Sequence, residues 1–220
     1  MYFNNFSKII YSFGDEGERA TMQDLSSYTE VIDKIKDNSA FYNNYYIKDG
    51  DRPDMLAFAF YKNPHLYWTF YMMNDKLRDQ GWPLDRKELD EKILEDFPNL
   101  VLETSDDIFM TFKVGQVVQG NSGTGTIAYR NLDLGQIVLT DVTGTFNTGE
   151  TVTSNDSLES VDLTSVVSEH LSVRYYDDND LPVTNSEYYN QQNTELRSIM
   201  IMKPSAVNRV AKLFYEAMGT

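Results

Sequence analysis

Acidic side chains are the most abundant groups in this sequence that could carry out chemistry. Asp177, Asp178 and Asp180 stand close together and offer the hard oxygen atoms that calcium prefers. They lack the regular alternation of ligands and the distal glutamate of a calcium-binding loop. We therefore interpret this cluster as a solvated turn after a predicted strand at residues 171–176.

A second acidic group surrounds Gly50. Asp49 and Asp51 belong to a predicted turn, and Asp54 falls in the first turn of a predicted helix, where the helix dipole favours negative charge. A glycosidase would need two carboxylates facing each other across a cleft. With 34 acidic residues in the chain, such a pair is expected by chance, so the sequence gives no support for one.

Histidine chemistry and nucleophile chemistry have no better support. The two histidines, His65 and His170, are far apart in the sequence, and His65 follows a proline that starts a helix, which favours a structural or capping role. The patterns HExxH, GxSxG and GxxxxGK[ST] are absent. The segment GNSGTG lacks the lysine and the following helix of a phosphate-binding loop, so we interpret it as a turn. The sequence predicts no enzyme activity, no metal site and no cofactor.

The charge balance limits the partners. The chain has 19 basic and 34 acidic residues and a formal charge of −15, which repels nucleic-acid phosphates and anionic lipid headgroups. We therefore expect neither a nucleic-acid partner nor a membrane partner. No apolar run reaches the roughly 18 residues of a membrane span, and the first residues do not have the pattern of a signal peptide. The absence of cysteine excludes disulfides and thiolate zinc sites.

The elements that would hold these residues are clearest in the middle of the N-terminal half. Residues 42–47 predict a strand, and the turn Lys48–Asp51 follows, with Asp51 expected to cap the next helix. Asn63-Pro64 ends that helix and starts a second one, which ends near Asn74. Gly81–Leu84 predicts a short returning strand. The expected order is strand, helix, helix, strand.

The flanking segments give weaker patterns. The first 20 residues form an apolar arm without a clean period, and residues 24–40 indicate a helix with a capping box at Ser27 and Glu30, or alternatively a strand. Residues 85–97 predict a charged helix. Its expected buried face consists of Leu89, Ile93, Leu94 and Phe97.

A different composition begins near residue 108. FKVGQVV at Phe112–Val118 returns as FNTGETV at Phe146–Val152, and glycine, valine and threonine dominate the sequence between them. We expect a small all-β unit with two related halves, either a compact barrel or a curled sheet. Further on, residues 196–202 predict a buried strand, and Pro204 leads into a final amphipathic helix.

These patterns predict the α+β class and four segments. The segments are an N-terminal arm and helix (1–41), a strand-helix-helix-strand domain with its following helix (42–107), an inserted β-barrel-like module (108–154) and a C-terminal strand and helix region that packs back on the second segment (155–220).

The segment YYIKDGDRPDMLAFAFYKNPHLYW (Tyr45–Trp68), followed by Asn74 and GWPL, resembles a LysM module. The resemblance implies a LysM-like βααβ unit. Most LysM domains bind polymers of N-acetylglucosamine in cell walls. One alternative function is therefore a peptidoglycan-binding or chitin-binding module, alone or attached to a cell-wall hydrolase.

The same segment also resembles the small baseplate wedge subunit of T-even-type contractile-tailed bacteriophages, which carries a LysM-like fold. The start MYFNNF, the segment RYYDDND and the tail ELRSIMIMKPSAVNRVAKLFYEAM are similar to that family too. The resemblance implies a structural subunit of the virion, assembled in the host cytoplasm. It also implies other wedge subunits as partners, with the sheath initiator or the hub as further candidates, and no small-molecule ligand. A third alternative is an adaptor outside any virus.

The 15 tyrosines, 12 phenylalanines and 2 tryptophans suit both a core and a docking surface, because aromatic side chains are favoured at interfaces. The sequence alone does not assign each ring to one of these roles. The candidates for protein interaction are Tyr2, Phe3, Phe6, Tyr61, Leu66, Tyr67, Trp68, Tyr71, Trp82 and Phe214.

Overall fold

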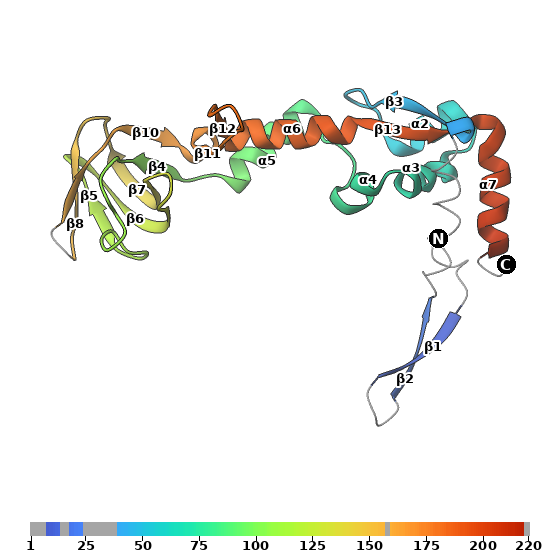
Figure 1. The fold of residues 1–220 in the computed structure, drawn as a ribbon, viewed down its shortest axis with the longest axis horizontal. Coiled ribbons are helices and arrows are strands. Elements are labelled where there is room, and N and C mark those ends of the chain that lie inside the picture. The colour runs from blue at the N-terminus through green and yellow to red at the C-terminus, as the bar shows by residue number, and fades with distance from the viewer. Residues whose placement is uncertain (1–7, 14–17, 24–38, 157–158, 218–220) are drawn as a thin grey trace. The chain divides into compact units, whose positions relative to one another are not determined.

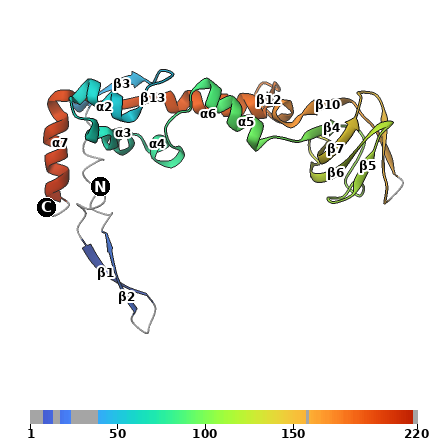
Figure 2. The same cartoon turned by 180° about the vertical axis from the view of Figure 1, so that it is seen from behind.

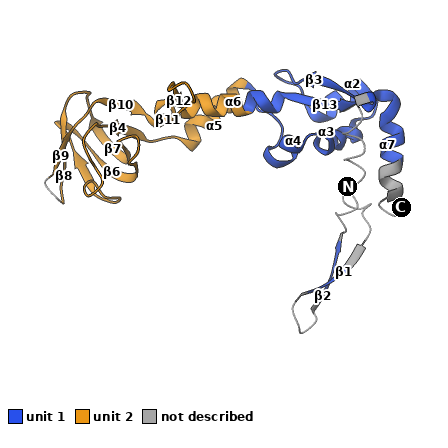
Figure 3. Cartoon of the chain, viewed as in Figure 1, with its two compact units in different colours: residues 1–85, 193–220 blue, residues 86–192 orange. Residues whose placement is uncertain are grey.

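The computed structural model describes residues 8–13, 18–23, 39–156 and 159–217. Residue contacts divide the chain into two compact units, coloured in Figure 3. Unit 1 comprises residues 1–85 and 193–220, and unit 2 comprises residues 86–192. Both units combine helices with strands, so the predicted α+β class is confirmed. The predicted division into four segments stays a prediction.

Unit 1 is built on two antiparallel strands that lie far apart in the sequence. Strand β3 (Tyr42–Tyr46) pairs with β13 (Ser198–Met202), and Tyr45 stands opposite Ile199 (Figures 1 and 2). The helices of this unit are α2 (Pro53–Tyr61), the 3-10 helix η3 (Pro64–Tyr67), α3 (Trp68–Met73), α4 (Asp75–Gln80) and α7 (Pro204–Ala217). The predicted first strand, the two predicted helices, the late strand and the final helix are thus confirmed, whereas α4 was not predicted.

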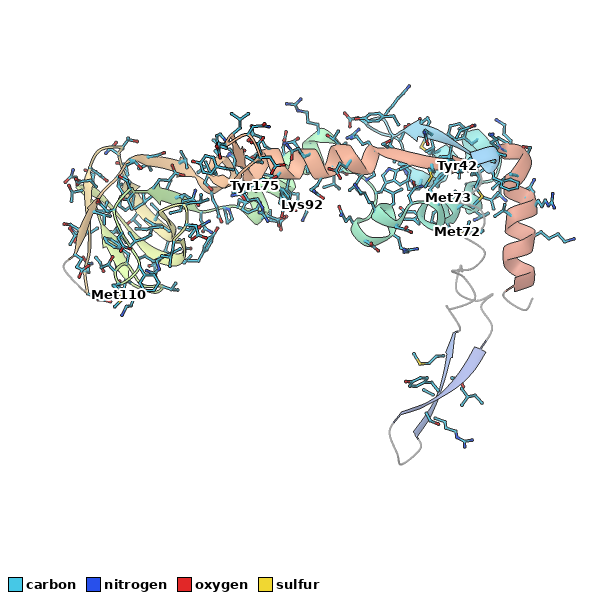
Figure 4. The ribbon with its side chains drawn as sticks, viewed as in Figure 1. Tyr42, Met72, Met73, Lys92, Met110 and Tyr175 are labelled. Carbon is cyan, nitrogen blue, oxygen red and sulfur yellow. The ribbon has the colours of Figure 1, made fainter. Side chains whose placement is uncertain are left out.

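The core of unit 1 has two apolar clusters. The first joins α3 to β13 and α7, and in Figure 4 Tyr42, Met72 and Met73 lie in the same part of this unit. Its buried members are Leu66, Trp68, Met72, Met73, Met202, Val207, Val210 and Ala211. The second joins α2, α3 and α4 to β13, with Ile47, Leu56, Ala57, Phe70, Leu77, Leu196, Ile199 and Ile201 buried.

The predicted returning strand at Gly81–Leu84 is wrong. This segment forms no strand. The indole nitrogen of Trp82 donates to the carbonyl of Asp51 at 2.7 Å instead. The backbone N–H and carbonyl of Leu84 are bound by the side chain of Asn193, at 2.8 and 3.0 Å. The strand that pairs with β3 is β13, from the other end of the chain, so the LysM-like unit is not confirmed.

The predicted helix cap at Asp51 is also wrong. The Oδ2 atom of Asp51 accepts hydrogen bonds from the N–H of Lys48 and the hydroxyl of Tyr45, both at 2.9 Å. The carboxylate therefore closes the turn in which Gly50 has a φ of 82°. Helix α2 starts after Arg52 without a side-chain cap, and Pro53 stands in its first turn, where the missing N–H costs little.

The N-terminal arm contains a hairpin that the sequence pattern did not predict. Strands β1 (Lys8–Phe13) and β2 (Glu18–Gln23) pair antiparallel, with Ile9 opposite Met22. The predicted helix over residues 24–40 lies outside the described residues except at its end, where Ser39–Phe41 form the 3-10 helix η2.

Unit 2 contains helix α5 (Arg86–Asp96) and most of α6 (Asn185–Arg197). Leu89 and Ile93 of α5 are buried as predicted, because residues four apart share one face of a helix. Leu94 is 55% exposed, so its predicted burial is wrong. Its position is turned by about 100° from that of Ile93. Phe97 is half-buried against Tyr189, with ring centroids 5.3 Å apart in an edge-on arrangement.

A curled sheet of seven strands forms most of unit 2, in the order β10-β4-β7-β6-β5-β8-β9. All neighbouring strands are antiparallel, and the two end strands, β10 and β9, are not paired with each other, so the predicted barrel is an open half-barrel. The strands are β4 (Leu100–Glu103), β5 (Val117–Gln119), β6 (Ser122–Asn131), β7 (Gln136–Thr145), β8 (Thr151–Ser154), β9 (Ser160–Asp162) and β10 (Ser165–Ser168). The sheet therefore extends beyond residues 108–154.

The remaining elements of unit 2 follow the sheet. They are the 3-10 helix η4 (Glu169–Leu171) and a hairpin of β11 (Val173–Tyr176) and β12 (Pro182–Thr184). The predicted turn at Asp177–Asp180 joins these two strands. Oδ1 of Asp177 accepts from the N–H groups of Asn179 and Leu181 at 2.9 Å each, and these bonds lower the pKa of Asp177. The predicted turn is therefore confirmed.

Candidate docking surface

The aromatic side chains around α2 and α3 form a continuous set of ring contacts. Tyr45 meets Phe60 edge-on at 5.3 Å between ring centroids. Tyr61 lies 5.8 Å from Phe70, and Phe70 lies 6.0 Å from Trp82. Such pairs bury large apolar areas and stabilise beyond simple area burial. Most of the aromatic density of the segment Tyr45–Trp68 therefore builds the core of unit 1.

The hydroxyls of Tyr45 and Tyr61 in this cluster are hydrogen-bond donors. The hydroxyl of Tyr61 donates to the carbonyl of Met202 at 3.2 Å, and burial raises the pKa of Tyr61 to about 12. Burial also raises the pKa of Tyr71 and, together with Asp51, that of Tyr45. These hydroxyls stay protonated near neutral pH, so they position side chains and do not act as general bases.

The predicted interaction residues divide between core and surface. Leu66 and Trp68 are buried, at 7% and 8% exposure, whereas Tyr67 is 43% exposed. Tyr61, Tyr71 and Trp82 are half-buried in the ring cluster. Of the other candidates, Tyr2, Phe3 and Phe6 and the side chain of Phe214 lie outside the described part of the chain.

Helix α2 presents an apolar surface that the sequence analysis did not separate from the core. Leu56 and Ala57 are buried, but Met55 is 61% exposed and Phe58 is 57% exposed. These two residues are three positions apart, so they lie on one face of the helix, together with the exposed Ala59. We call Met55, Phe58 and Ala59 the α2 face. The composition of the helix could have revealed this surface. Helix α2 is apolar all round, and such helices are normally buried on every side, so a face that its own chain leaves open indicates contact with another protein.

The β1–β2 hairpin also exposes apolar side chains. Ile10, Tyr11 and Met22 are 72%, 52% and 46% exposed. A hairpin of two strands has little stability of its own in water. Its exposed apolar residues therefore suit contact with another surface.

Among the described residues, no group of three or more His, Asp and Glu side chains could hold a metal ion. His65 is exposed, and its backbone N–H donates to the side chain of Asn63 at 3.0 Å, which caps η3. The capping side chain is therefore that of Asn63, and the structural or capping role of His65 stays a prediction. In the described part of the chain, no helix is long and apolar enough to cross a membrane.

The buried polar groups of unit 2 escaped the sequence analysis. Glu169 is 3% exposed, and its carboxylate accepts from the hydroxyl of Tyr129 and from the N–H of Asn99. Burial is the main cause that raises the pKa of Tyr129, and the neighbouring Glu169 raises it further. The Glu169 carboxylate therefore joins β6 to η4 and to the residue before β4. We interpret the contact between Glu169 and Tyr129 as structural, because both side chains have hydrogen-bond partners.

The fold and the exposed side chains define a class of protein: an α+β chain that presents apolar surface on a preformed helix and a hairpin, as docking subunits do. Comparison with known proteins agrees with this class. The family model for base plate wedge protein 53 matches residues 1–92. The baseplate wedge protein gp53 of Enterobacteria phage T4 is 31% identical over 104 residues.

The extent of this similarity matters for its interpretation. The aligned part covers 46% of this chain and 53% of the T4 protein, so the chain spans about half the length of the relative it matches. The family match contains the β1–β2 hairpin, β3 and the helices α2 to α4. It ends within α5, before the curled sheet of unit 2.

Proposed function

We propose that this chain is a structural subunit of a phage tail baseplate wedge and joins neighbouring wedges around the hub through protein-protein contacts. Its place of action would be the virion, and its partners would be other wedge proteins, the sheath initiator or the hub. The similarity to base plate wedge protein 53 over residues 1–92 supports the baseplate role. Nothing in the comparisons supports the peptidoglycan-binding alternative.

The α2 face is the observation that carries the docking part of this proposal. It lies inside the matched residues, and its two large side chains are more than half exposed in the isolated chain. Exposed Met and Phe side chains can bury large apolar areas on binding, and the helix backbone that carries them is already ordered. We expect the α2 face to be covered by another baseplate protein after assembly.

The test is an assembly assay with the double variant Met55→Ser and Phe58→Ser. Because both side chains are exposed, the variant should keep the wild-type melting temperature within a few degrees. We expect it to yield at least about tenfold fewer complete baseplates, counted by electron microscopy after complementation of a phage that lacks the gene.

Leu94→Ser is the matched control, because Leu94 is 55% exposed but lies outside the matched residues. It should assemble as the wild type does. Wild-type assembly by the double variant would contradict the proposal. An equal loss in both variants would show a general effect of removing exposed apolar side chains and would contradict it too.

A further inference from the structure

The two repeated segments of unit 2 fold into the same turn. Gly115 and Gly149 both have left-handed backbones, with φ of 87° and 84°. The N–H of Gly115 donates to the carbonyl of Ile127 at 2.9 Å, and the N–H of Gly149 donates to the carbonyl of Leu163 at 2.8 Å. The two turns therefore have matching hydrogen bonds, and their residues correspond one to one at a spacing of 34 positions.

The buried positions of the two turns carry the same residue types. Phe112 corresponds to Phe146, and Val118 corresponds to Val152. All four side chains are at most 7% exposed and belong to one apolar cluster. These positions are fixed by packing, so their agreement follows from the shared fold.

The exposed positions differ in a consistent way. Phe109 and Met110 just before the first turn are 64% and 73% exposed, and Val114 and Val117 within the first repeated segment are 62% and 38% exposed. We call these four residues the apolar loop. In the second turn, Thr148 and Thr151 correspond to Val114 and Val117 and are also exposed, whereas the positions 34 residues after Phe109 and Met110 belong to strand β7. The second turn shows that this turn forms with threonine at both positions, so its folding does not require the apolar side chains of Val114 and Val117.

The apolar loop is held in one conformation. Nη1 of Arg130 donates to the carbonyls of Ile108 and Thr111, at 2.7 and 2.5 Å. Ile108 and Phe112 are buried on either side of the exposed Phe109 and Met110. Met110 lies at the periphery of unit 2 in Figure 4. Residues that are fixed in this way before binding form better docking sites than flexible ones.

The backbone of Phe112, inside the first repeated segment, has an unusual conformation. Its φ is 52°, in the left-handed region that bulky residues rarely adopt, whereas Phe146 is not among the residues with positive φ. Backbone strain of this kind persists where the surrounding contacts impose it, and it occurs often at functional sites. Here, the contacts of Arg130 and the burial of Phe112 impose it.

Charge indicates what could cover the apolar loop. Unit 2 has 6 basic and 19 acidic residues, so its formal charge is 6 − 19 = −13 out of −15 for the chain. A second copy of this unit would be repelled, as would nucleic acid or an anionic membrane. A protein surface with an apolar socket and a basic rim fits both the loop and the charge.

We propose that the apolar loop docks unit 2 onto a second, different protein whose contact surface is apolar at its centre and rich in Lys and Arg around it. This proposal rests on the proposed function, and the partner is therefore another protein of the same baseplate. The apolar loop belongs to unit 2 and the α2 face to unit 1, and the loop lies outside the residues that match the baseplate family.

The test places a photoreactive benzoylphenylalanine at Val114 in the full-length chain, inside baseplates purified from the complemented phage. Thr148 is the matched control, because it is the equivalent exposed position of the second turn. We expect a discrete adduct from position 114 with one other baseplate protein, at least about tenfold more abundant than that from position 148. Mass spectrometry should place the adduct beside Lys and Arg residues of that protein.

The double change Phe109→Thr and Val117→Thr removes two exposed apolar side chains of the loop and should reduce the adduct from position 114 at least about tenfold at an unchanged melting temperature. An undiminished adduct, equal adducts from positions 114 and 148, an adduct with another copy of this chain, or no adduct in baseplates that contain the chain would overturn the proposal. Absence of the chain from the baseplates would overturn the proposed function as well.

Discussion

Tyr61 shows how one side chain serves both packing and connection in unit 1. Its ring contacts Phe60 and Phe70, at 6.4 and 5.8 Å between centroids. Its hydroxyl reaches the carbonyl of Met202, so it ties α2 to the end of β13. The sequence analysis named Tyr61 as a candidate for both the core and the docking surface. The structure places it half-buried between those two elements.

The raised pKa of Tyr61 leads to a prediction for alkaline solution. In the unfolded chain a tyrosine ionises near pH 10, whereas Tyr61 in the folded protein keeps its proton up to about pH 12. The stabilising contribution is therefore fully present below pH 10 and is lost as the pH rises to about 12. We expect the free energy of unfolding to fall by roughly 2 to 3 kcal/mol more over this interval in the wild type than in Tyr61→Phe.

Urea titrations at several pH values between 9 and 12.5 measure this difference. At neutral pH, Tyr61→Phe should be less stable by about 1 kcal/mol, because it loses one hydrogen bond. Parallel curves for the two proteins above pH 10 would show that the hydroxyl is not protected by burial.

Among the elements of unit 1, two asparagine side chains link segments that lie far apart in the sequence. Asn74 donates to the carbonyls of Phe70 and Met200 and accepts from the N–H of Met200, each at 2.8 Å. Asn193 binds both backbone groups of Leu84. These contacts link the helical part of unit 1 to the segment that contains β13.

Asn74→Ala should therefore destabilise unit 1 locally. The change removes three hydrogen bonds and leaves backbone groups of β13 without their partner, so we expect a loss of about 2 to 3 kcal/mol in the free energy of unfolding. Hydrogen exchange of the β3 and β13 amides should accelerate correspondingly. Asn208→Ala, at an exposed position of α7, should leave the exchange unchanged. Equal protection of β13 in both variants would refute the role given to Asn74.

The elements that the sequence predicted correctly are those with local signals. Pro53, Asn63-Pro64 and Pro204 mark helix starts, and the spacing of Leu89 and Ile93 marks the inner side of α5. The pairing of β3 with β13 carries no local signal, because the two strands are separated by most of the chain. Short α4 has a single buried residue, Leu77, which is too little for a recognisable period.

The candidate docking residues could be predicted only in part, because the sequence does not show what covers an apolar side chain. An apolar ring looks the same in sequence whether it is covered by its own domain or by a partner. Trp68 and Tyr67 are neighbours, yet one is buried and the other exposed. Met55 and Phe58 were hidden because α2 has no polar side from which an outward direction could be read. The apolar loop becomes visible only when it is compared with its own repeat.

At the scale of the whole molecule, the charge is distributed unevenly between the two units. Unit 1 has 13 basic and 15 acidic residues, a formal charge of 13 − 15 = −2, and unit 2 carries the remaining −13. Repulsion among like charges destabilises a compact state and is screened by salt. Unit 2 should therefore depend on ionic strength much more than unit 1.

Hydrogen exchange can follow both units in one sample. Between about 10 and 300 mM sodium chloride, the amides of β6 and β7 should gain protection, because the Debye length falls from about 30 Å to below 10 Å. Those of β3 and β13 should change little. A similar response in both sheets would contradict the assignment of the self-repulsion to unit 2.

We propose above that the chain is a baseplate subunit whose exposed apolar residues are covered by other proteins. A cryo-electron microscopy reconstruction of the intact tail, from the phage that encodes this chain, tests it most directly. We predict that the chain lies in the baseplate, with Met55 and Phe58 buried against a neighbouring protein. A baseplate without this chain, or with the α2 face open to solvent, would contradict the account.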